Sequence, residues 1–434
     1  MAKAFIDDTH LTDIADAIRG KLGVSTQYLP SEMADAIESI PSGGGGGAVE
    51  KKDVNFYDYD GTLLYSYTAA EALALGAMPD LPDHEGLRGD TWNYNLGQMQ
   101  AYVNDYKKMD IGAMYVPTDN AMHLTWEAAT TDDLEAALNL SGTVSNAVSV
   151  DWGDGSPVET WAGTSLQRKT HTYSAVGTYE VKVMCSSGNI VLSSYIYGAK
   201  KVIGSDGSTG TVNNNRVCRY TKVIIPSVVT SIGNNCFYDC PSLRYILIPP
   251  SVTSLGSTCF YNNSSLQSVV IPSSVTSLGN GCFSTCPSLQ LVIIPSSVTS
   301  LGTNCFNNNS SLKSVIIPSS VTSLGANCFN TCLSLQSVMI PSSVTTLGGS
   351  CFFNCPSLQS VIIPSSVTSL GGSCFGTCQS LFKYHFISST PPTLASTNSL
   401  TVGNGTTIYV PAGYLTDYQT ANIWSTWGGK MAEE

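Results

Sequence analysis

A 23-residue sequence motif is repeated about seven times between Lys222 and Lys383. The copy that begins at Ile271 reads IPSSVTSLGNGCFSTCPSLQLVI. Three of its elements recur in step, namely the proline (Pro226, Pro249, Pro272, Pro295, Pro318, Pro341, Pro364), a Cys-Phe pair (first at Cys236-Phe237, last at Cys374-Phe375) and a leucine (Leu243, Leu266, Leu289, Leu312, Leu335, Leu358, Leu381). A fixed period of roughly 20–50 residues indicates stacked supersecondary units. One unit cannot close its own core, so the sequence predicts a solenoid.

These repeats, together with the ending IYVPAGYLTDYQTANIWSTW at Ile408–Trp427, resemble the BspA-like leucine-rich repeat family across about 200 residues. The period reaches back into residues 200–222, where Tyr220 occupies the leucine register and Val217 the register of the second cysteine. An entry cap is therefore expected there. We expect the solenoid over residues 201–384 and a C-terminal cap over residues 385–434.

The repeat Leu266–Pro287 shows what each position does. The spacing and the family pattern both place eight of its side chains inward: Leu266, Val269, Ile271, Val275, Leu278, Cys282, Phe283 and Cys286. Pro272 ends the first strand because it cannot donate to a ladder. Gly279 is expected to allow the turn. With coils stacked at about 4.8 Å, each inward position becomes a ladder of like residues.

Twelve of the fourteen cysteines lie in the repeat, at positions that the period explains. We interpret them first as small buried packing residues. Disulfides are a second interpretation, but Cys282 and Cys286 are poorly placed for one if their turn is helical. A zinc site is a third, and it conflicts with the second cysteine position, which runs Cys240, Asn263, Cys286, Asn309, Cys332, Cys355, Cys378. A small, partly buried position where asparagine bonds to the backbone explains the alternation.

One position departs from the family pattern. The residue between the two inward strand positions is usually polar in this family, but here it is apolar, at Leu247, Val270, Ile293, Ile316, Met339 and Ile362 (the apolar stripe). If the register is right, these side chains point out of the sheet, and an extended exposed apolar patch marks an interface. A one-residue register error would instead put them inside. The stripe is our candidate binding site, packed against another copy or another part of the chain.

The charge is low, at 12% of residues, and unevenly placed. Residues 1–200 carry 27 acids and 12 bases, a net −15, and the remainder carries five acids and eight bases, a net +3, which together give −12. A solenoid with a neutral Ser/Thr/Asn surface has no basic footprint for nucleic acid. No apolar run approaches the ~18 residues of a membrane span. The first residues also lack the pattern of a signal peptide.

The first half is expected to be modular. Residues 1–42 read as two short amphipathic helices, and such helices are marginal alone, so we expect them to dock on a partner or on other copies of themselves. A self-contained helical hairpin is the alternative. The glycine run within residues 43–49 is a hinge. Residues 50–117, with a hairpin at Asp60-Gly61 and a helix near Leu96, resemble the small β-grasp-like repeats of bacterial surface proteins.

Residues 118–200 read as all-β. The stretches VSVDWGDG (148–155), HTY (171–173) and GTYEVKV (177–183) resemble a PKD domain, an immunoglobulin-like sandwich. Asp154-Gly155 suits a tight turn, and Trp152 is a large core anchor. The fold class is therefore mainly β and multidomain: short N-terminal helices, a small α+β module, a β-sandwich, and a capped leucine-rich-repeat solenoid.

One motif could carry chemistry. Asp58-Tyr59-Asp60-Gly61-Thr62 resembles the first motif of haloacid-dehalogenase-type phosphatases, which implies an Asp nucleophile and Mg²⁺. That enzyme needs a parallel α/β sheet and later motifs, whereas these residues alternate like a hairpin, so we expect a turn. The histidines, His10, His84, His123, His171 and His385, have no ligand spacing. We predict no enzyme, no catalytic or metal residues and no cofactor.

The start of the chain, FIDDTHLTDIADAIRGKLG, resembles tail and baseplate proteins of phages from Gram-positive, gut-type bacteria. This resemblance implies a phage tail fibre or baseplate protein of the virion, made in the host cytoplasm. It would attach to other tail proteins through residues 1–42, self-associate, by analogy as a trimer, and present the solenoid to a host cell-surface protein or glycan.

The alternative is a bacterial cell-surface adhesin or interaction protein, because such repeats and PKD-like domains are typical of surface-displayed proteins. A phosphatase acting through Asp58–Thr62 is a third class. Neither nucleic acid nor membrane insertion is expected in any of them.

Overall fold

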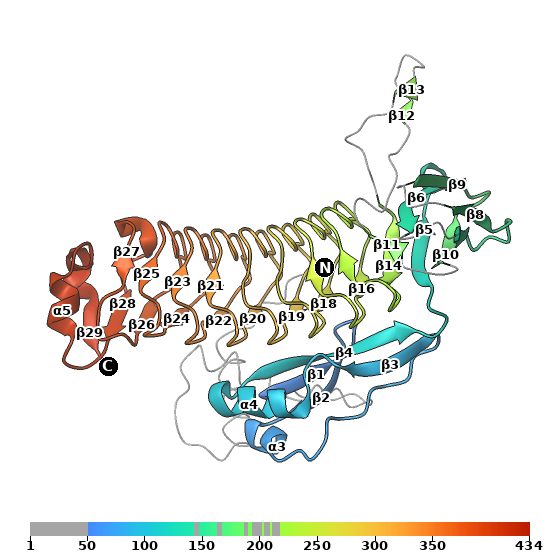
Figure 1. Cartoon of the computed structure of the whole chain (residues 1–434). Helices are drawn as coiled ribbons and strands as arrows, with labels where there is room; N and C mark the ends of the chain where they lie inside the picture. The colour runs from blue at the N-terminus through green and yellow to red at the C-terminus, as the bar shows by residue number, and fades with distance from the viewer. Residues whose placement is uncertain are drawn as a thin grey trace, which may run out of the picture.

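The computed structural model describes residues 51–142, 147–162, 167–185, 190–192, 202–203, 209–210 and 218–434. Over these residues the protein is mainly β, with N-terminal sheets, a solenoid of about nine turns and few helices. Figure 1 shows the solenoid as a long stack, with one small module along its side and a second body at its start. The predicted helices in residues 1–42 and the hinge at 43–49 lie outside the described residues. No helix within the described residues is long and apolar enough to cross a bilayer.

The first module is a mixed sheet with two helices. Its elements are β1 (Val54–Tyr57), β2 (Leu63–Tyr67), α3 (Ala69–Leu73), β3 (Leu87–Trp92), α4 (Leu96–Tyr106) and β4 (Met109–Pro117). The strand order is β2-β1-β4-β3, with β1 and β4 parallel and the outer strands antiparallel. Gly61, at φ 89°, closes the expected hairpin in a conformation that glycine adopts freely. Helix α3 was not expected from the sequence, although the capping box formed by Thr68 and Glu71 marks its start.

The second body consists of two packed sheets. Its elements are β5 (Met122–Ala128), η1 (Thr131–Asp133), β6 (Glu135–Gly142), β7 (Ala147–Asp151), β8 (Glu159–Ala162), β9 (Gln167–Thr172), β10 (Gly177–Cys185) and β11 (Ile190–Val191). One sheet contains β5, β10, β7 and β8, and the other has the order β11-β6-β9. Trp152 and Tyr173 are buried in the hydrophobic core. A separate pair, β12 (Val202–Ile203) and β13 (Thr209–Gly210), is antiparallel.

The second body and the solenoid share one hydrogen-bonded sheet. Strand β14 (Tyr220–Ile224) pairs antiparallel with β5 and parallel with β16 (Tyr245–Leu247). Tyr220, expected in the leucine register of an entry cap, is buried against Trp126 at 5.0 Å between ring centroids. Its hydroxyl donates to the Ala137 carbonyl at 3.1 Å. The two-sheet body therefore closes the first coil, and a single core runs from Met122 to Trp424.

Two ladders of short parallel strands run along the solenoid. One side, the sheet face, continues through β18 (Ser268–Val270), β19 (Leu291–Ile293), β20 (Ser314–Ile316), β22 (Ser337–Met339), β24 (Ser360–Ile363), β26 (Lys383–Phe386), β28 (Thr407–Val410) and β29 (Met431–Glu433). The other comprises β15 (Ser231–Ile232), β17 (Ser254–Leu255), β21 (Ser323–Leu324), β23 (Thr346–Leu347), β25 (Ser369–Leu370) and β27 (Thr393–Leu394). Paired strands sit in the same register of successive coils, as Val315 and Val338 do.

All eight inward positions predicted for the repeat Leu266–Pro287 are buried. The phenylalanine ladder from Phe237 to Phe375 stacks with ring centroids 5.1–5.7 Å apart and planes within 8° of parallel. Gly279 has a different role from the predicted turn. A Cβ on Gly279 would lie 2.5 Å from the Gly256 carbonyl carbon, so glycine is needed because two coils approach closely.

The cysteine–asparagine alternation has a hydrogen-bonding explanation. The Cys286 thiol donates to the Phe260 carbonyl at 3.2 Å, and Asn309 Nδ2, one coil later, donates to the equivalent Phe283 carbonyl at 3.1 Å. Asn309 Oδ1 also accepts from the Cys286 N–H at 2.8 Å. At these two positions a thiol and an amide thus satisfy equivalent buried carbonyls. Asn263 shares only the second contact, because its Oδ1 accepts from the Cys240 N–H at 2.8 Å while its Nδ2 has no hydrogen-bond acceptor. Burial raises the pKa of Cys286 to about 12, which keeps the thiol protonated and unreactive.

One cysteine of the repeat differs from this packing role. Cys240 forms a disulfide with Cys218, which lies 22 residues earlier in the entry cap and one position away from the repeat register. Our first interpretation, packing alone, is therefore wrong at Cys240. The repeat does not predict this pair because Cys218 falls outside the 23-residue period.

The C-terminal cap closes the far end of the core. It contains η2 (Thr397–Ser399), α5 (Leu415–Thr420) and η3 (Trp424–Lys430) in addition to β28 and β29. Trp424 is buried edge-on against Phe386, with ring centroids 4.8 Å apart, and its indole N–H donates to the Pro392 carbonyl at 2.8 Å. The last coil therefore does not expose its inward residues to solvent.

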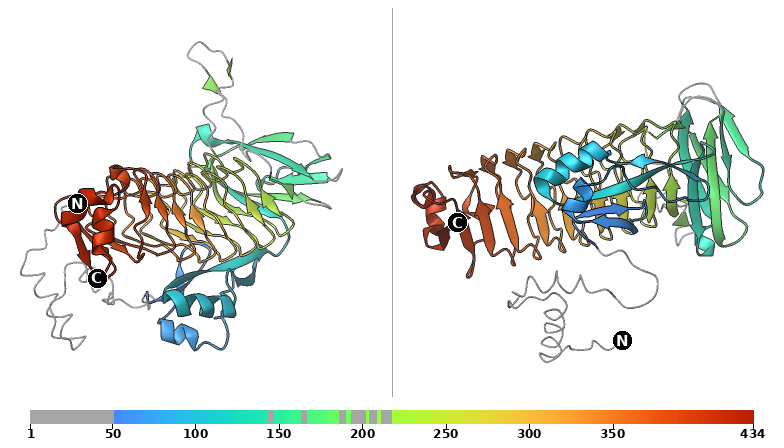
Figure 2. Two further views of the ribbon diagram at one scale, coloured as in Figure 1. Left: turned by 60° about the vertical axis from the view of Figure 1, so that its left-hand side comes forward. Right: turned by 90° about the horizontal axis from the view of Figure 1, so that it is seen from below.

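The first module lies across the sheet face, as Figure 2 shows from below. Strand β4 crosses β16, β18 and β19, and Met114 packs with Val270 and Ile293. The Tyr94 hydroxyl donates to the Ile294 carbonyl at 2.7 Å, and the Ser268 hydroxyl donates to the Tyr59 carbonyl at 3.3 Å. Apolar packing and hydrogen bonds together hold the module on the solenoid.

A substitution at Gly112, which contacts the solenoid, tests this packing. A Cβ on Gly112 would lie 2.5 Å from Cγ1 of Val270, so Gly112→Ala overpacks the interface and should cost about 1–3 kcal/mol. Urea unfolding of the full chain, with amide hydrogen exchange followed in β4, measures this loss. The control is Gly76→Ala, where an added Cβ meets nothing within 4 Å. Equal stability of the two variants would contradict the described packing.

Candidate binding groove

The apolar stripe divides into a covered half and an uncovered half. Its members change along the solenoid from buried (Leu247, Val270, Ile293) through half-buried (Ile316, Met339) to exposed (Ile362, 56% exposed). Burial alternates along β24, where Val361 and Ile363 point inward and Ser360 and Ile362 point outward. The stripe therefore lies on the outside of the sheet, in the register that we predicted.

The module covers the first half of the stripe. Leu247 joins a core that includes Ile111 and Tyr115 of β4, while Val270 and Ile293 join a second cluster with Tyr57 and Met114. The partner of these three residues is thus another part of the same chain. Within the described residues, no such cover lies over Ile362.

A groove of about 740 Å³ opens on the sheet face where the module ends. Its floor is apolar and comes from the solenoid: Ile316, Met339, Ile362, Pro364 and Ile387. Serine side chains of β20, β22 and β24 lie beside this floor, at Ser314, Ser337 and Ser360. We call this the sheet-face groove. It combines an apolar base with hydroxyl groups that repeat every coil.

The module supplies a charged wall to the sheet-face groove. Lys51, Lys52 and Asp53 precede β1, and Lys108 and Asp110 lie at the start of β4. Because β1 and β4 are parallel and pair from Val54 opposite Met109, their N-terminal ends meet at one edge of the sheet. That edge brings three lysines from distant parts of the sequence to one side of the groove.

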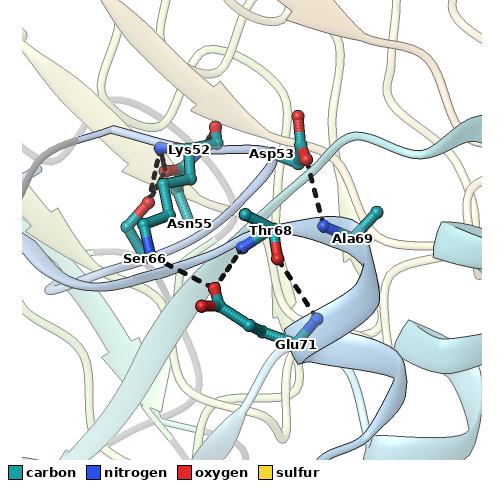
Figure 3. A network of polar contacts seen from close by, with 7 residues as sticks. All are labelled: Lys52, Asp53, Asn55, Ser66, Thr68, Ala69 and Glu71. Atoms are coloured by element: carbon teal, nitrogen blue, oxygen red, sulfur yellow. Dashed lines mark hydrogen bonds and ion pairs between the residues drawn. The ribbon is translucent and has the colours of Figure 1, made fainter. Parts of the chain in front are cut away.

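A polar network connects part of this wall to β2 and to the start of α3, as Figure 3 shows. Lys52 Nζ lies 3.1 Å from Glu71 Oε2, whose carboxylate also accepts from the Thr68 N–H at 2.7 Å. The Lys52 backbone N–H donates to Ser66 Oγ at 2.6 Å, and the Asp53 carboxylate accepts from the Ala69 N–H at 3.0 Å. These contacts hold the residues just before β1 against β2 and α3.

Asp110 is a wall carboxyl whose pKa is shifted by its surroundings. Burial raises its pKa above the usual range, opposed by the nearby charge of Lys51 and by a hydrogen bond from Asn55 Nδ2 at 3.1 Å. The Lys51 ammonium lies 5.7 Å from the centre of the Tyr57 ring. A partly desolvated carboxyl beside lysines makes the wall sensitive to the charge of whatever enters the groove.

The uncovered sheet face continues past the groove toward the C-terminal cap. His385 and Tyr409 occupy the register of Ile362 in the next two coils, and their rings stack with centroids 4.7 Å apart. Ile387 is 56% exposed. In Figure 2 these strands lie beyond the module, on the open part of the face. Apolar and aromatic side chains thus extend the surface that begins in the groove.

The phosphatase-like motif forms no open catalytic site. Asp58 is buried, with Oδ1 accepting from the Tyr59 N–H and Oδ2 bonded to His84 Nε2, both at 2.8 Å. The Asp58 N–H donates to the Thr62 carbonyl and closes the hairpin. Both carboxylate oxygens are engaged within the fold, so the geometry is that of a structural turn.

The other predicted chemistry-bearing residues are also dispersed. Each described histidine bonds one carboxylate: His84 with Asp58, His123 with Asp119, His171 with Asp154 and His385 with Glu434. His10 lies outside the described residues. No group of three potential metal-ligating side chains occurs in the part of the chain that the structure describes.

The sequence pattern predicts the floor of the groove but not its wall. An apolar residue at an outward position is visible in the period, and this signal marks the floor. Ile387 lacks the signal because it replaces the proline of the repeat, one coil after Pro364. Lys51, Lys52 and Lys108 are unremarkable charges in a mixed module. The wall needs the parallel β1–β4 pairing, and no local pattern reports it.

A comparison with known protein families identifies the repeat. Residues 214–332 and 302–399 match the model of the BspA type leucine rich repeat region, in six copies. The matched residues are somewhat less than half of the chain. This protein therefore carries a BspA-type leucine-rich repeat region, as the resemblance implied. No curated protein matches the chain.

Three solved structures illustrate the likeness. A leucine-rich repeat protein from Bacteroides ovatus is 25% identical, with TM-score 0.32, over 44% of this chain and 62% of that one. The T. pallidum leucine rich repeat protein is 24% identical, with TM-score 0.30, over 41% and 81%. A leucine rich cell surface protein from Faecalibacterium prausnitzii is 24% identical, with TM-score 0.26, over 44% and 73%. This chain thus covers less than two thirds of the first protein.

The raised pKa of Asp110 predicts a pH effect. Asp110 keeps its proton to higher pH in the folded state than in the unfolded chain. Its ionisation therefore lowers the free energy of unfolding as the pH rises above the ordinary aspartate pKa. We expect Asp110→Asn to remove that cost. The difference in unfolding free energy between variant and parent should then increase with pH over this range. Denaturation of both full-length proteins at several pH values measures it, and a difference independent of pH would contradict the assignment.

Proposed function

We propose that this protein is a non-catalytic binding protein displayed at a bacterial surface. Its partner, a host surface glycoprotein of the mucin class, lies against the uncovered end of the sheet face. The observation that supports this proposal is the division of the apolar stripe. The protein buries the first half under its own module and leaves Ile362 and Ile387 exposed beside a groove. Exposed apolar surface of this kind marks an interaction site.

The chemistry of the solenoid favours a neutral partner. Between Val223 and Leu381 the only charged residues are Asp239, Arg244 and Lys313. Repeated serine hydroxyls beside aliphatic side chains suit the polar and apolar faces of sugars and of Ser/Thr-rich peptides. Each contact is weak, but one contact per coil along a rod gives avidity toward a repetitive partner.

The two-sheet body is proposed as a PKD-like spacer. Trp152 stacks on His171, with ring centroids 5.1 Å apart, and the Tyr173 hydroxyl donates to the Trp152 carbonyl at 2.9 Å. Hydrogen bonds from Ser156 and His171 lower the pKa of Asp154 to about 2, so this carboxylate stays ionised at neutral pH. These contacts join two of the three sequence stretches that resemble PKD domains, and Trp152 and Tyr173 belong to the core of the body.

The uncovered face can be tested by binding. Ile362→Thr together with Ile387→Thr should reduce binding of the purified full chain to immobilised mucin by about tenfold or more, because two buried aliphatic contacts are lost. Leu333→Thr is the matched control, since Leu333 is 40% exposed but lies outside the groove lining. Surface plasmon resonance measures the affinities. No binding by the parent, or equal loss in the control, would argue against the proposal.

A second candidate function rests on residues 1–42. Their resemblance to phage tail and baseplate proteins supports a virion protein that attaches through this segment and self-associates, with a trimer as the expected state. Mass spectrometry of purified phage particles should then detect the chain, and deletion of residues 1–42 should remove it from them. Detection on bacterial cells but not in particles would favour the surface protein.

A further inference from the structure

We propose that the sheet-face groove binds residues 31–42 of the same chain, here called the acidic segment. This contact goes beyond the proposed function, because it needs no host partner. Residues 31–42 lie outside the described residues, and only their sequence enters the proposal. Three properties support it: the charge of the groove wall, the apolar floor, and the point at which the described chain begins.

Charge complementarity favours this occupant. The acidic segment reads SEMADAIESIPS and carries three acids, Glu32, Asp35 and Glu38, with no base. The groove wall carries three lysines, Lys51, Lys52 and Lys108, and two acids, Asp53 and Asp110, so its formal charge is net positive. Lys52 is already paired with Glu71, whereas Lys51 and Lys108 lie near Asp110, whose ionised form burial disfavours. An incoming carboxylate would therefore meet Lys51 and Lys108. Among the described residues that line the groove, the solenoid contributes no lysine or arginine, so the attraction comes from the module wall.

The apolar pattern of the segment matches the floor. Met33, Ala34, Ile37 and Ile40 recur at helical spacing and form one stripe, with the acids on the flanks and the opposite side. A helix this short is marginal in water and needs an apolar surface to stabilise it. The floor residues Met339, Ile362 and Ile387 supply such a surface next to the lysines. Docking would cover the part of the apolar stripe that the module leaves open.

The tether keeps the segment within reach of the groove. The described chain begins at Lys51, which itself lines the groove. Residues 43–50 separate it from the acidic segment, and eight residues can span up to about 28 Å. Five of them are glycines, Gly43–Gly47, a composition typical of flexible linkers. A short tether of this kind gives an effective concentration of roughly millimolar, and a weak contact is then populated within one molecule.

Site-specific photocrosslinking of the full chain tests the contact. We expect p-benzoylphenylalanine at position 37 to crosslink within one chain to peptides that contain Met339, Ile362 or Ile387. The same probe at position 18, in the first predicted helix, is the control for nonspecific crosslinking. Mixing chains labelled with heavy and light isotopes separates crosslinks within one chain from those between two chains.

Charge-reversal variants test whether the crosslink depends on attraction between the acidic segment and the lysines of the groove wall. Lys108→Glu should reduce the yield of the groove crosslink by about fivefold or more, and Glu38→Lys with Asp35→Lys in the same chain should restore it. Lys430→Glu makes the same change of net charge in the cap and should leave the yield unchanged. Crosslinks only between chains, crosslinks that avoid the groove, or an equal effect of Lys430→Glu would overturn the proposal. Loss of mucin binding by the variants at Ile362 and Ile387 would not, because the crosslink is measured without a partner.

Discussion

The structure depends on the parallel backbone ladder that links one coil to the next. Strand β14 connects this ladder to β5 of the two-sheet body, so the hydrogen bonds continue from a sandwich into a solenoid. A parallel ladder in register forces every inward residue to meet its own counterpart one coil away. This constraint explains the stacked phenylalanines, and it explains why Gly256 and Gly279 have no room for a side chain.

The same ladder generates the outward row of the apolar stripe. Because side chains alternate along each short strand, an apolar residue at one outward position is copied along the whole rod. The chain uses this row in two ways. Val270 and Ile293 form an internal interface with the module, whereas Ile362 stays exposed. One repeated residue type is thus buried in an internal interface or left exposed, depending on whether the module reaches it.

The cysteines show how a buried polar requirement can be met by different residues. Cys286 and Asn309 both donate to the carbonyl of a phenylalanine in the preceding coil, and the Cys286 thiol stays protonated in the core. Cys240 belongs to the same register but forms a disulfide with Cys218. The entry coil therefore has a covalent connection at the place where it joins the two-sheet body.

The sequence alone determined the solenoid, its inward positions and the outward direction of the apolar stripe, because a 23-residue period leaves few ways to stack a chain. The role of Tyr220 in the entry cap and the hairpin at Asp60-Gly61 could also be predicted from the sequence, since both depend on neighbouring residues or on the period. Only the tertiary structure decided which half of the stripe is covered. That outcome depends on how far β4 reaches across the sheet face. The lysine wall likewise requires Lys51 and Lys108 to meet through the pairing of β1 with β4, a contact between residues more than fifty positions apart that no local pattern encodes.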